Sequence, residues 1–150
     1  MSEIIKPEYV FLDVPAATVD EALDFLAGKA VELGITDDKA AVLDAFKARE
    51  AEGSTGMDGF ALPHAKSEAV KEMSVIVARF TGAVEWKGMS DQPIKVAFAL
   101  LAPEAEAGTT YLQTLAAIAG AITKSKSFLS DVLAATDPAA VAADLAKAIA

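Results

Sequence analysis

The chain has 150 residues, of which 53% are hydrophobic, and its length predicts one domain, residues 1–150, with a substantial core. It contains no cysteine and only one histidine, which excludes disulfides and thiolate catalysis, and no metal or other cofactor is expected. The formal net charge of −9 at pH 7 disfavours nucleic acid as a partner, and no basic stripe offsets it.

A short strand and a helix are predicted first. Residues 9–12 have the composition of a strand, and Pro15 ends it. Thr18 and Glu21 have the spacing of a capping box, in which the threonine hydroxyl accepts a hydrogen bond from the backbone three residues later. Leucines and alanines follow at helical spacing until Gly34, which is placed to end the helix.

A second helix is predicted to begin after Thr36, a favourable N-cap residue. Asp37 and Asp38 would lie in its first turn, where the helix dipole favours negative charge. Gly53 is placed to close the helix. Arg49 is therefore expected near its C-terminal end, just before a Gly-Ser-Thr-Gly turn.

Strands are predicted in the middle of the chain. A loop with two glycines and a proline contains a short strand at 60–62. Residues 74–80 are rich in β-branched side chains. Residues 94–101 are almost entirely apolar, which is typical of a strand buried on both faces. Residues 84–86 are interpreted as a short edge piece between these two strands.

Three helices are predicted after the strands. Apolar residues at helical spacing mark one helix over 112–122 and a short one over 128–133. Asp137 followed by Pro138 has the pattern of an N-cap and a first helical residue, and it opens a final helix. Because helices both precede and follow the strands, we expect one sheet with helices packed on its faces.

His64, the only histidine, is close in sequence to several groups that can hold an anion. A neutral imidazole is a good nucleophile near neutral pH. Phosphoryl transfer asks a protein mainly for positioning and for stabilisation of charge on the transferred oxygens. Gly53 and Gly56 allow backbone N–H groups to face an anion, and the hydroxyls of Ser54 and Thr55 can donate hydrogen bonds.

Arg49 and Pro63 complete this group of residues. Arg49 brings a planar and permanently charged donor. Pro63 biases Leu62 toward an extended conformation, which would fix how His64 is presented. The pattern therefore favours a nucleophile next to an anion-binding loop.

Each of these residues also has a purely structural interpretation. A lone histidine is often an ordinary core or surface residue, and Gly53–Gly56 could be a plain turn whose hydroxyls cap backbone groups. Arg49 could complement the end of its helix, or pair with Glu50 or Glu52. Pro63 could be a strand-edge residue only. Composition and spacing alone leave these alternatives open.

Other chemistries have less support. A hydrolase could use Ser54 and His64, but the sequence lacks a Gly-x-Ser-x-Gly elbow. It also lacks the glycine-rich nucleotide-binding motifs. No apolar run approaches the ~20 residues of a membrane-spanning helix, and no secretory leader is visible. We therefore expect a cytoplasmic protein without direct membrane insertion.

Three groups of residues together resemble a known signature. They are Arg49-Glu50, Ser54-Thr55-Gly56 and Ala61-Leu62-Pro63-His64-Ala65. In this order and spacing they resemble the enzyme IIA domain of the fructose/mannitol type, from the bacterial phosphoenolpyruvate-dependent sugar phosphotransferase system (PTS). The resemblance covers nearly the whole chain. It implies an α/β fold of the α+β type, with a single mixed β-sheet flanked by helices on both faces.

The resemblance also implies a phosphocarrier. Proteins of this family accept a phosphoryl group from the histidine-containing phosphocarrier protein onto the motif histidine, which is His64 here. They then pass it to a cysteine of a IIB domain or protein, which phosphorylates the sugar during uptake. Transfer through a covalent phosphohistidine follows from the family mechanism.

Tyr111 marks a departure from the family pattern. Many members, notably of the mannitol type, carry a second histidine at the start of the helix after the last core strand. Aligned on Leu112-Gln113-Thr114-Leu115, that position holds Tyr111, whose hydroxyl can donate one hydrogen bond but stays neutral. The site residues implied are His64, Arg49, Ser54 and Thr55 for catalysis and Gly53, Gly56, Pro63 and Tyr111 for binding.

A second hypothesis keeps the fold and changes the role. Nitrogen-type relatives of enzyme IIA are regulatory proteins whose phosphorylation state controls binding to partners. Tyr111 favours this version, as does the expectation of a freestanding chain with no attached IIB or membrane segment. The sequence does not identify the sugar, the phosphorylated nitrogen of His64 or the oligomeric state.

Overall fold

The computed structural model describes residues 4–106 and 108–149. The first three residues, where no secretory leader was visible, lie outside this part of the chain. The elements are η1 (Pro7–Tyr9), β1 (Val10–Val14), α1 (Val19–Glu32), α2 (Lys39–Ala51), β2 (His64–Ser67), β3 (Ser74–Val84), β4 (Ile94–Pro103), η2 (Glu104–Glu106), α3 (Thr109–Lys124), α4 (Lys126–Ala134) and α5 (Pro138–Ile149). No helix within the described ranges is long and apolar enough to cross a membrane.

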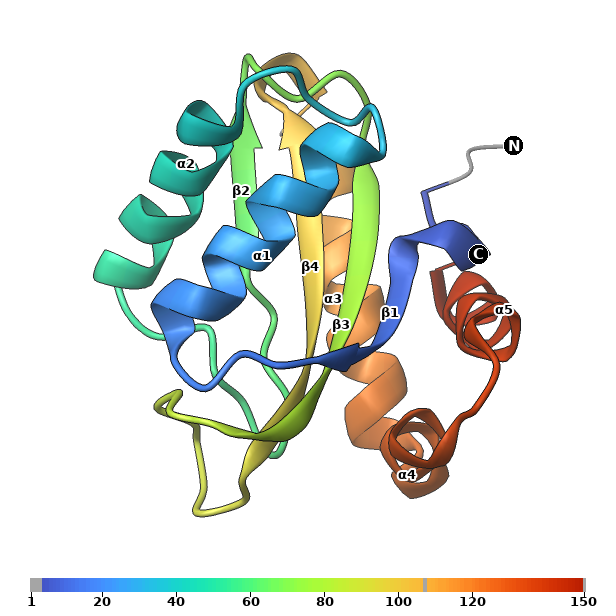
Figure 1. Cartoon of the computed structure of the whole chain (residues 1–150). Helices are drawn as coiled ribbons and strands as arrows, with labels where there is room; N and C mark the ends of the chain where they lie inside the picture. The colour runs from blue at the N-terminus through green and yellow to red at the C-terminus, as the bar shows by residue number, and fades with distance from the viewer. Residues whose placement is uncertain (1–3, 107, 150) are drawn as a thin grey trace.

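The four strands form one mixed sheet in the order β1-β3-β4-β2. The two central strands, β3 and β4, are antiparallel, whereas β1 runs parallel to β3 and β2 runs parallel to β4. Helices α1 and α2 cover one face and α3 covers the other, while α5 packs beside β1 (Figure 1). The predicted fold, a single mixed sheet flanked by helices on both faces, is confirmed.

The sheet separates two apolar cores because successive strand residues point to opposite faces. Ile76 and Ala99 belong to the core beneath α1 and α2, which we call the α1/α2 core. Val77 and Phe98 belong to the core shared with α3, α4 and α5, which we call the α3–α5 core. The prediction that residues 94–101 are buried on both faces is therefore confirmed for all of them except the exposed Lys95.

The first helix begins as its sequence predicts. The Thr18 hydroxyl accepts a hydrogen bond from the backbone N–H of Glu21 at 3.2 Å. The Glu21 carboxylate reaches back one residue further than expected and accepts from the N–H of Ala17 at 2.8 Å. Gly34 follows the helix with a φ of +77°, a conformation that favours glycine.

The predicted start of the second helix is wrong by two residues. Asp38 is the N-cap, and its carboxylate accepts from the N–H of Ala41 at 3.1 Å. Thr36 is buried instead: its hydroxyl donates to the carbonyl of Ala69 at 2.7 Å and accepts from the N–H of Asp38. A long-range partner therefore takes the threonine away from the capping role, and an aspartate performs it.

The strand before the two central strands is also displaced from its prediction. Ala61 makes only isolated bridges, to Gly56 and Ala97, and the regular strand β2 begins three residues later at His64. The predicted edge piece at 84–86 is the end of β3 followed by a single bridge from Glu85 to Thr18. The predicted strands 74–80 and 94–101 are confirmed and extend to Val84 and Pro103.

Candidate functional site

His64 is the first residue of β2, at the edge of the sheet, where both helical layers can reach it. It pairs with Leu100 of β4, and Leu100 faces the α3–α5 core, so the imidazole lies on that side of the sheet. Tyr111 of α3 packs there edge-to-face, with ring centroids 6.0 Å apart. Arg49, from the last turn of α2 on the other layer, also contacts the ring. The imidazole is half-buried between them.

The two nitrogens of His64 have different partners, and these assign the tautomer. Arg49 Nε donates a hydrogen bond to Nε2 at 3.0 Å. Because a guanidinium only donates, Nε2 carries the lone pair. Nδ1 lies 2.8 Å from the carbonyl oxygen of Leu62, which only accepts, so Nδ1 carries the proton. The lone pair of His64 is therefore on Nε2, where it accepts from a permanently charged guanidinium.

The surroundings of His64 favour its neutral form. Burial lowers the pKa of His64 below the ordinary 6.5, and the charge of Arg49 lowers it further. The hydrogen bond to Leu62 and the carboxylates of Glu50 and Glu52 act in the opposite direction but do not reverse the shift. At neutral pH the imidazole is therefore uncharged and nucleophilic.

Arg49 also fixes the loop that follows its own helix. Its Nη1 donates to the carbonyl oxygen of Gly53 at 2.8 Å. Gly53 follows the helix with a φ of +147°, which a side chain rarely adopts. One guanidinium thus joins the helix end, the 53–56 loop and His64.

The hydroxyls of Ser54 and Thr55, which were predicted to donate hydrogen bonds to an anion, already bind other groups of the protein. Ser54 Oγ donates to the carbonyl oxygen of Lys87 at 2.5 Å and accepts from the N–H of Gly56 at 3.0 Å. The Thr55 hydroxyl donates to Glu50 Oε2, and the Thr55 side chain is buried. Ser54 is exposed, whereas Thr55 is not. The structure thus brings Arg49 and Tyr111 to His64, and it places these two hydroxyls in contacts of the adjacent loop.

Gly56 and Pro63 shape the backbone around His64. A Cβ on Gly56 would lie 2.1 Å from the carbonyl oxygen of Lys87, so only glycine fits. Pro63 is buried, and its carbonyl accepts from the N–H of Leu100 at 3.0 Å, which fixes β2 against β4 just before the imidazole.

Tyr111 contacts His64 through its ring. Its side chain is buried, and burial raises the pKa of the phenol to about 12, although the charge of Arg49 acts in the opposite direction. The hydroxyl therefore remains protonated at every physiological pH. Tyr111 fills the space beside His64 with a neutral aromatic group.

Glu50 and Trp86 contact each other beside the 53–56 loop, although neither was predicted to be a catalytic or binding residue. Glu50 Oε1 accepts from the N–H of Thr55 at 3.1 Å and from the indole N–H of Trp86 at 3.2 Å. Trp86 is buried. The only sequence signal for Glu50 was its place in the Arg49-Glu50 pair, and the contact with Trp86 spans 36 residues.

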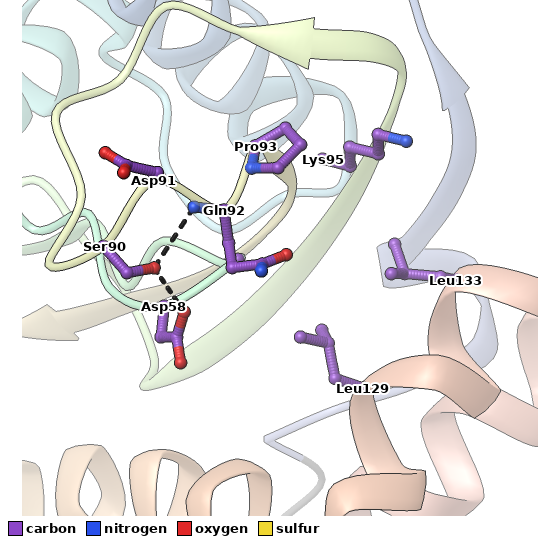
Figure 2. Close-up of a pocket in the computed structure, with 9 residues that line it drawn as sticks. Asp58, Ser90, Asp91, Gln92, Pro93, Lys95, Leu129 and Leu133 are labelled. Atoms are coloured by element: carbon purple, nitrogen blue, oxygen red, sulfur yellow. Dashed lines mark hydrogen bonds between the residues drawn. The ribbon is translucent and has the colours of Figure 1, made fainter.

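A separate hollow lies away from His64, between α4 and the connection from β3 to β4. Its volume is about 600 Å³, and Leu129 and Leu133 of α4 form one wall (Figure 2). On the opposite side, Ser90 donates to Asp58 and accepts from the N–H of Gln92. Within residues 4–106 and 108–149, no three histidine, cysteine or acidic residues gather as a metal site would require.

Comparison with known proteins gives one consistent family. The sequence model of the protein family described as "Phosphoenolpyruvate-dependent sugar phosphotransferase system, EIIA 2" matches residues 3–148. The PTS system fructose-specific EIIA component of Haloferax volcanii is 36% identical over 146 residues, covering 89% of this chain and 94% of that protein. A nitrogen regulatory protein of Bradyrhizobium diazoefficiens is 32% identical over 120 residues, covering 79% of this chain and 77% of that protein. The resemblance inferred from the motif is confirmed.

Solved structures agree on the fold. The nitrogen regulatory protein IIA-Ntr from Neisseria meningitidis superposes with a TM-score of 0.86 at 26% identity, over 95% of this chain and 97% of that one. Enzyme IIA mannitol from Escherichia coli, solved in complex with phosphorylated enzyme IIB mannitol, gives a TM-score of 0.78 at 22% identity over the same shares. At that identity the second match supports the architecture alone.

Proposed function

Because the chain belongs to the EIIA type 2 family of the PTS and is a phosphocarrier of that system, we propose that His64 is the residue that carries the phosphoryl group. The observation that supports this most directly is the pair of hydrogen bonds to its ring. They leave the lone pair on Nε2, beside Arg49, in an imidazole that is neutral at pH 7. We therefore propose Nε2 as the phosphorylated atom.

The proposed transfer needs no proton to move. The Nε2 lone pair attacks phosphorus, a new P–N bond forms, and the P–N bond of the donor phosphohistidine breaks, returning its electron pair to the donor ring. Positive charge develops on the accepting imidazole. The Leu62 carbonyl, which already accepts from Nδ1–H, stabilises that charge.

Arg49 has two successive roles in this mechanism. Before transfer, its Nε hydrogen bond to Nε2 orients the ring. As the phosphoryl group arrives, that bond must break, and the same guanidinium is then placed to donate to the phosphoryl oxygens. Ser54 is proposed as a further oxygen ligand because it is exposed and needs only rotation away from Lys87. Thr55 would have to leave Glu50 to do the same.

The partners follow from the family. We propose the histidine-containing phosphocarrier protein as donor and a IIB domain or protein as acceptor, in the cytoplasm. Membership of the EIIA type 2 family supports both partners. Sugar uptake is the preferred role because the fructose-specific relative matches a larger share of this chain at higher identity than the nitrogen regulatory one.

Incubation with phosphoenolpyruvate, enzyme I and the histidine-containing phosphocarrier protein tests the proposal. The wild type is expected to gain one acid-labile phosphoryl group, and His64→Gln is expected to gain none. NMR of the product should show phosphorus on Nε2. A wild type that stays unmodified, or a His64→Gln variant that is still phosphorylated, would contradict the assignment.

A regulatory role is the second candidate. It is favoured by the likeness to nitrogen regulatory proteins, including the TM-score of 0.86 with IIA-Ntr. A partner that binds only one of the two phosphorylation states would support it. Transfer from the phosphorylated protein to a IIB protein, with no such partner, would support the transport role.

A further inference from the structure

We propose that Glu50 is a positioning residue for phosphoryl transfer, whose carboxylate holds the 53–56 loop and, through it, the backbone that orients His64. The inference rests on the proposed function of His64 for its kinetic consequence. Its structural part concerns the free protein and stands on the hydrogen bonds alone.

Glu50 gathers three donors on one carboxylate. Oε1 accepts from the N–H of Thr55 at 3.1 Å and from the indole N–H of Trp86 at 3.2 Å, and Oε2 accepts from the Thr55 hydroxyl. Glu50 is half-buried, and the side chains of Thr55 and Trp86 are 4% and 7% exposed. Hydrogen bonds to an ionised carboxylate are stronger than neutral ones, so this cluster is a firm local anchor.

A continuous set of hydrogen bonds leads from Glu50 to His64. Glu50 holds both the N–H and the hydroxyl of Thr55. The Thr55 carbonyl accepts from the N–H of Leu62 at 3.0 Å. The Leu62 carbonyl in turn lies 2.8 Å from His64 Nδ1. Displacing the carboxylate would therefore loosen the carbonyl that keeps the proton on Nδ1 and the lone pair on Nε2.

The same carboxylate joins the end of α2 to the connection between β3 and β4. Trp86 belongs to that connection, and Lys87 next to it accepts from Ser54. Arg49 precedes Glu50 on α2 and contacts both Gly53 and His64. Glu50 thus fixes the end of α2 relative to the 53–56 loop. The end of α2 carries Arg49, and the loop would surround the phosphoryl group.

Charge supplies a second and separable effect. The charged groups that act on His64 are Arg49, Glu50 and Glu52 from the end of α2, while Tyr111 faces it from α3 as a neutral phenol. Arg49 lowers the pKa of His64, and the two glutamates raise it. Glu52 is exposed and shares the charge effect without the contacts to Thr55 and Trp86, so it is a matched control.

Three variants distinguish the effect of the position of the Glu50 carboxylate from the effect of its charge. Glu50→Asp keeps the charge but retracts the carboxylate by one methylene. Glu50→Gln keeps the length but removes the charge, and Glu52→Gln removes a neighbouring charge only. The measurements are hydrogen exchange of the Thr55 and Leu62 amides, NMR titration of His64, and the phosphoryl-transfer rate, with thermal unfolding as the check that each variant is folded.

Glu50→Asp is expected to speed exchange of both amides and to slow transfer about tenfold, the loss typical of one charge-assisted hydrogen bond. Its His64 pKa should stay near that of the wild type. Glu50→Gln should lower the pKa of His64, and it should speed the exchange of the two amides less than Glu50→Asp does. Glu52→Gln should lower the pKa while leaving the exchange, and the transfer rate at pH 8, unchanged.

Two results would overturn the positioning role. One is wild-type amide exchange and transfer in both Glu50 variants. The other is a Glu52→Gln variant that reproduces every effect of the Glu50 variants. If the wild type accepts no phosphoryl group, the proposed function fails, and the exchange and titration data still decide whether Glu50 orients His64.

Discussion

His64 combines a fixed tautomer with a neutral ring, and both follow from its immediate neighbours. The Leu62 carbonyl and the Arg49 guanidinium offer opposite hydrogen-bonding groups to the two nitrogens. Tyr111 closes the side of the ring that faces α3, and burial raises the pKa of its phenol to about 12. Tyr111, at the position where the resemblance led us to look for a second histidine, therefore stays neutral at physiological pH.

The pKa of His64 is expected to lie below 6.5 because burial and Arg49 disfavour the imidazolium. The acid limb of the transfer rate should follow the same pKa, since only the neutral ring carries a lone pair on Nε2. As the only histidine, His64 can be titrated by NMR without overlap. A midpoint at or above 6.5 would contradict this prediction.

Because the pKa of His64 is lower in the folded protein, the free energy of unfolding should decrease at acidic pH. Below pH 6.5 the unfolded chain binds a proton at this position more readily than the folded chain does. Stability contributed by neutral His64 is thus present above 6.5 and is lost as the pH falls from 6.5 through the folded pKa. His64→Gln should lack this component of the acid destabilisation, and chemical denaturation at several pH values measures it.

At the scale of elements, two loops form the site by close backbone contact. Met89 donates its N–H to the carbonyl of Met57 at 3.1 Å, and Ser54 donates to Lys87 in the same region. Gly56 lies against the carbonyl of Lys87, where a Cβ would be only 2.1 Å away. The 53–56 loop therefore takes its shape from the connection between β3 and β4.

Gly56→Ala is expected to destabilise the protein by about 2 kcal/mol and to slow phosphoryl transfer, because the added methyl forces the two backbones apart. Gly82→Ala is the control, since a Cβ there meets nothing within 4 Å. Thermal unfolding and the transfer assay compare the two variants. Equal stability of both would show that the loops can separate without cost.

Local patterns predicted most elements, and the errors came from long-range partners. The cap at Thr18 needs only its own helix, and its hydroxyl accepts from Glu21 as expected, while the Glu21 carboxylate accepts from Ala17 instead of Thr18. Thr36 failed as a cap because Ala69, which is 33 residues away, accepts its hydroxyl. Arg49 and His64 could be grouped as candidate site residues from their motif, and the fold brings them into contact. The contacts of Glu50 could not be predicted, because they depend on where the fold brings Trp86.

At the scale of the whole molecule, Arg79 connects the sheet to the C-terminal helices. Its Nε donates to the carbonyl of Leu12 in β1 at 3.0 Å. Its Nη1 donates to the carbonyls of Val132, Leu133 and Ala135 at the end of α4. One side chain of β3 thus donates to carbonyls at the end of α4, of which only that of Val132 is also bonded to the N–H of Ala135 among the backbone bonds at this helix end. Its positive charge lies at the C-terminal end of the helix, where the helix dipole stabilises a cation.

Arg79→Met is expected to lower the free energy of unfolding by about 2 kcal/mol, because the charged donor is removed and several carbonyls lose their partner. The His64 titration should not change, since Arg79 lies outside its surroundings. Lys95→Met, on the neighbouring strand and exposed, controls for the loss of a positive charge. Loss of stability in Lys95→Met alone would contradict the prediction.

Trp86 is the only tryptophan of the chain, and its indole N–H is bound to the carboxylate that holds Thr55. Its emission therefore originates from a single ring that is buried beside the site. If the 53–56 loop rearranges and Glu50 moves away, the indole N–H of Trp86 loses its charged hydrogen-bond acceptor. The wavelength of the fluorescence emission should then shift. The emission wavelength of Trp86 is therefore an intrinsic reporter of the contact between Glu50 and the 53–56 loop, and it requires no added label.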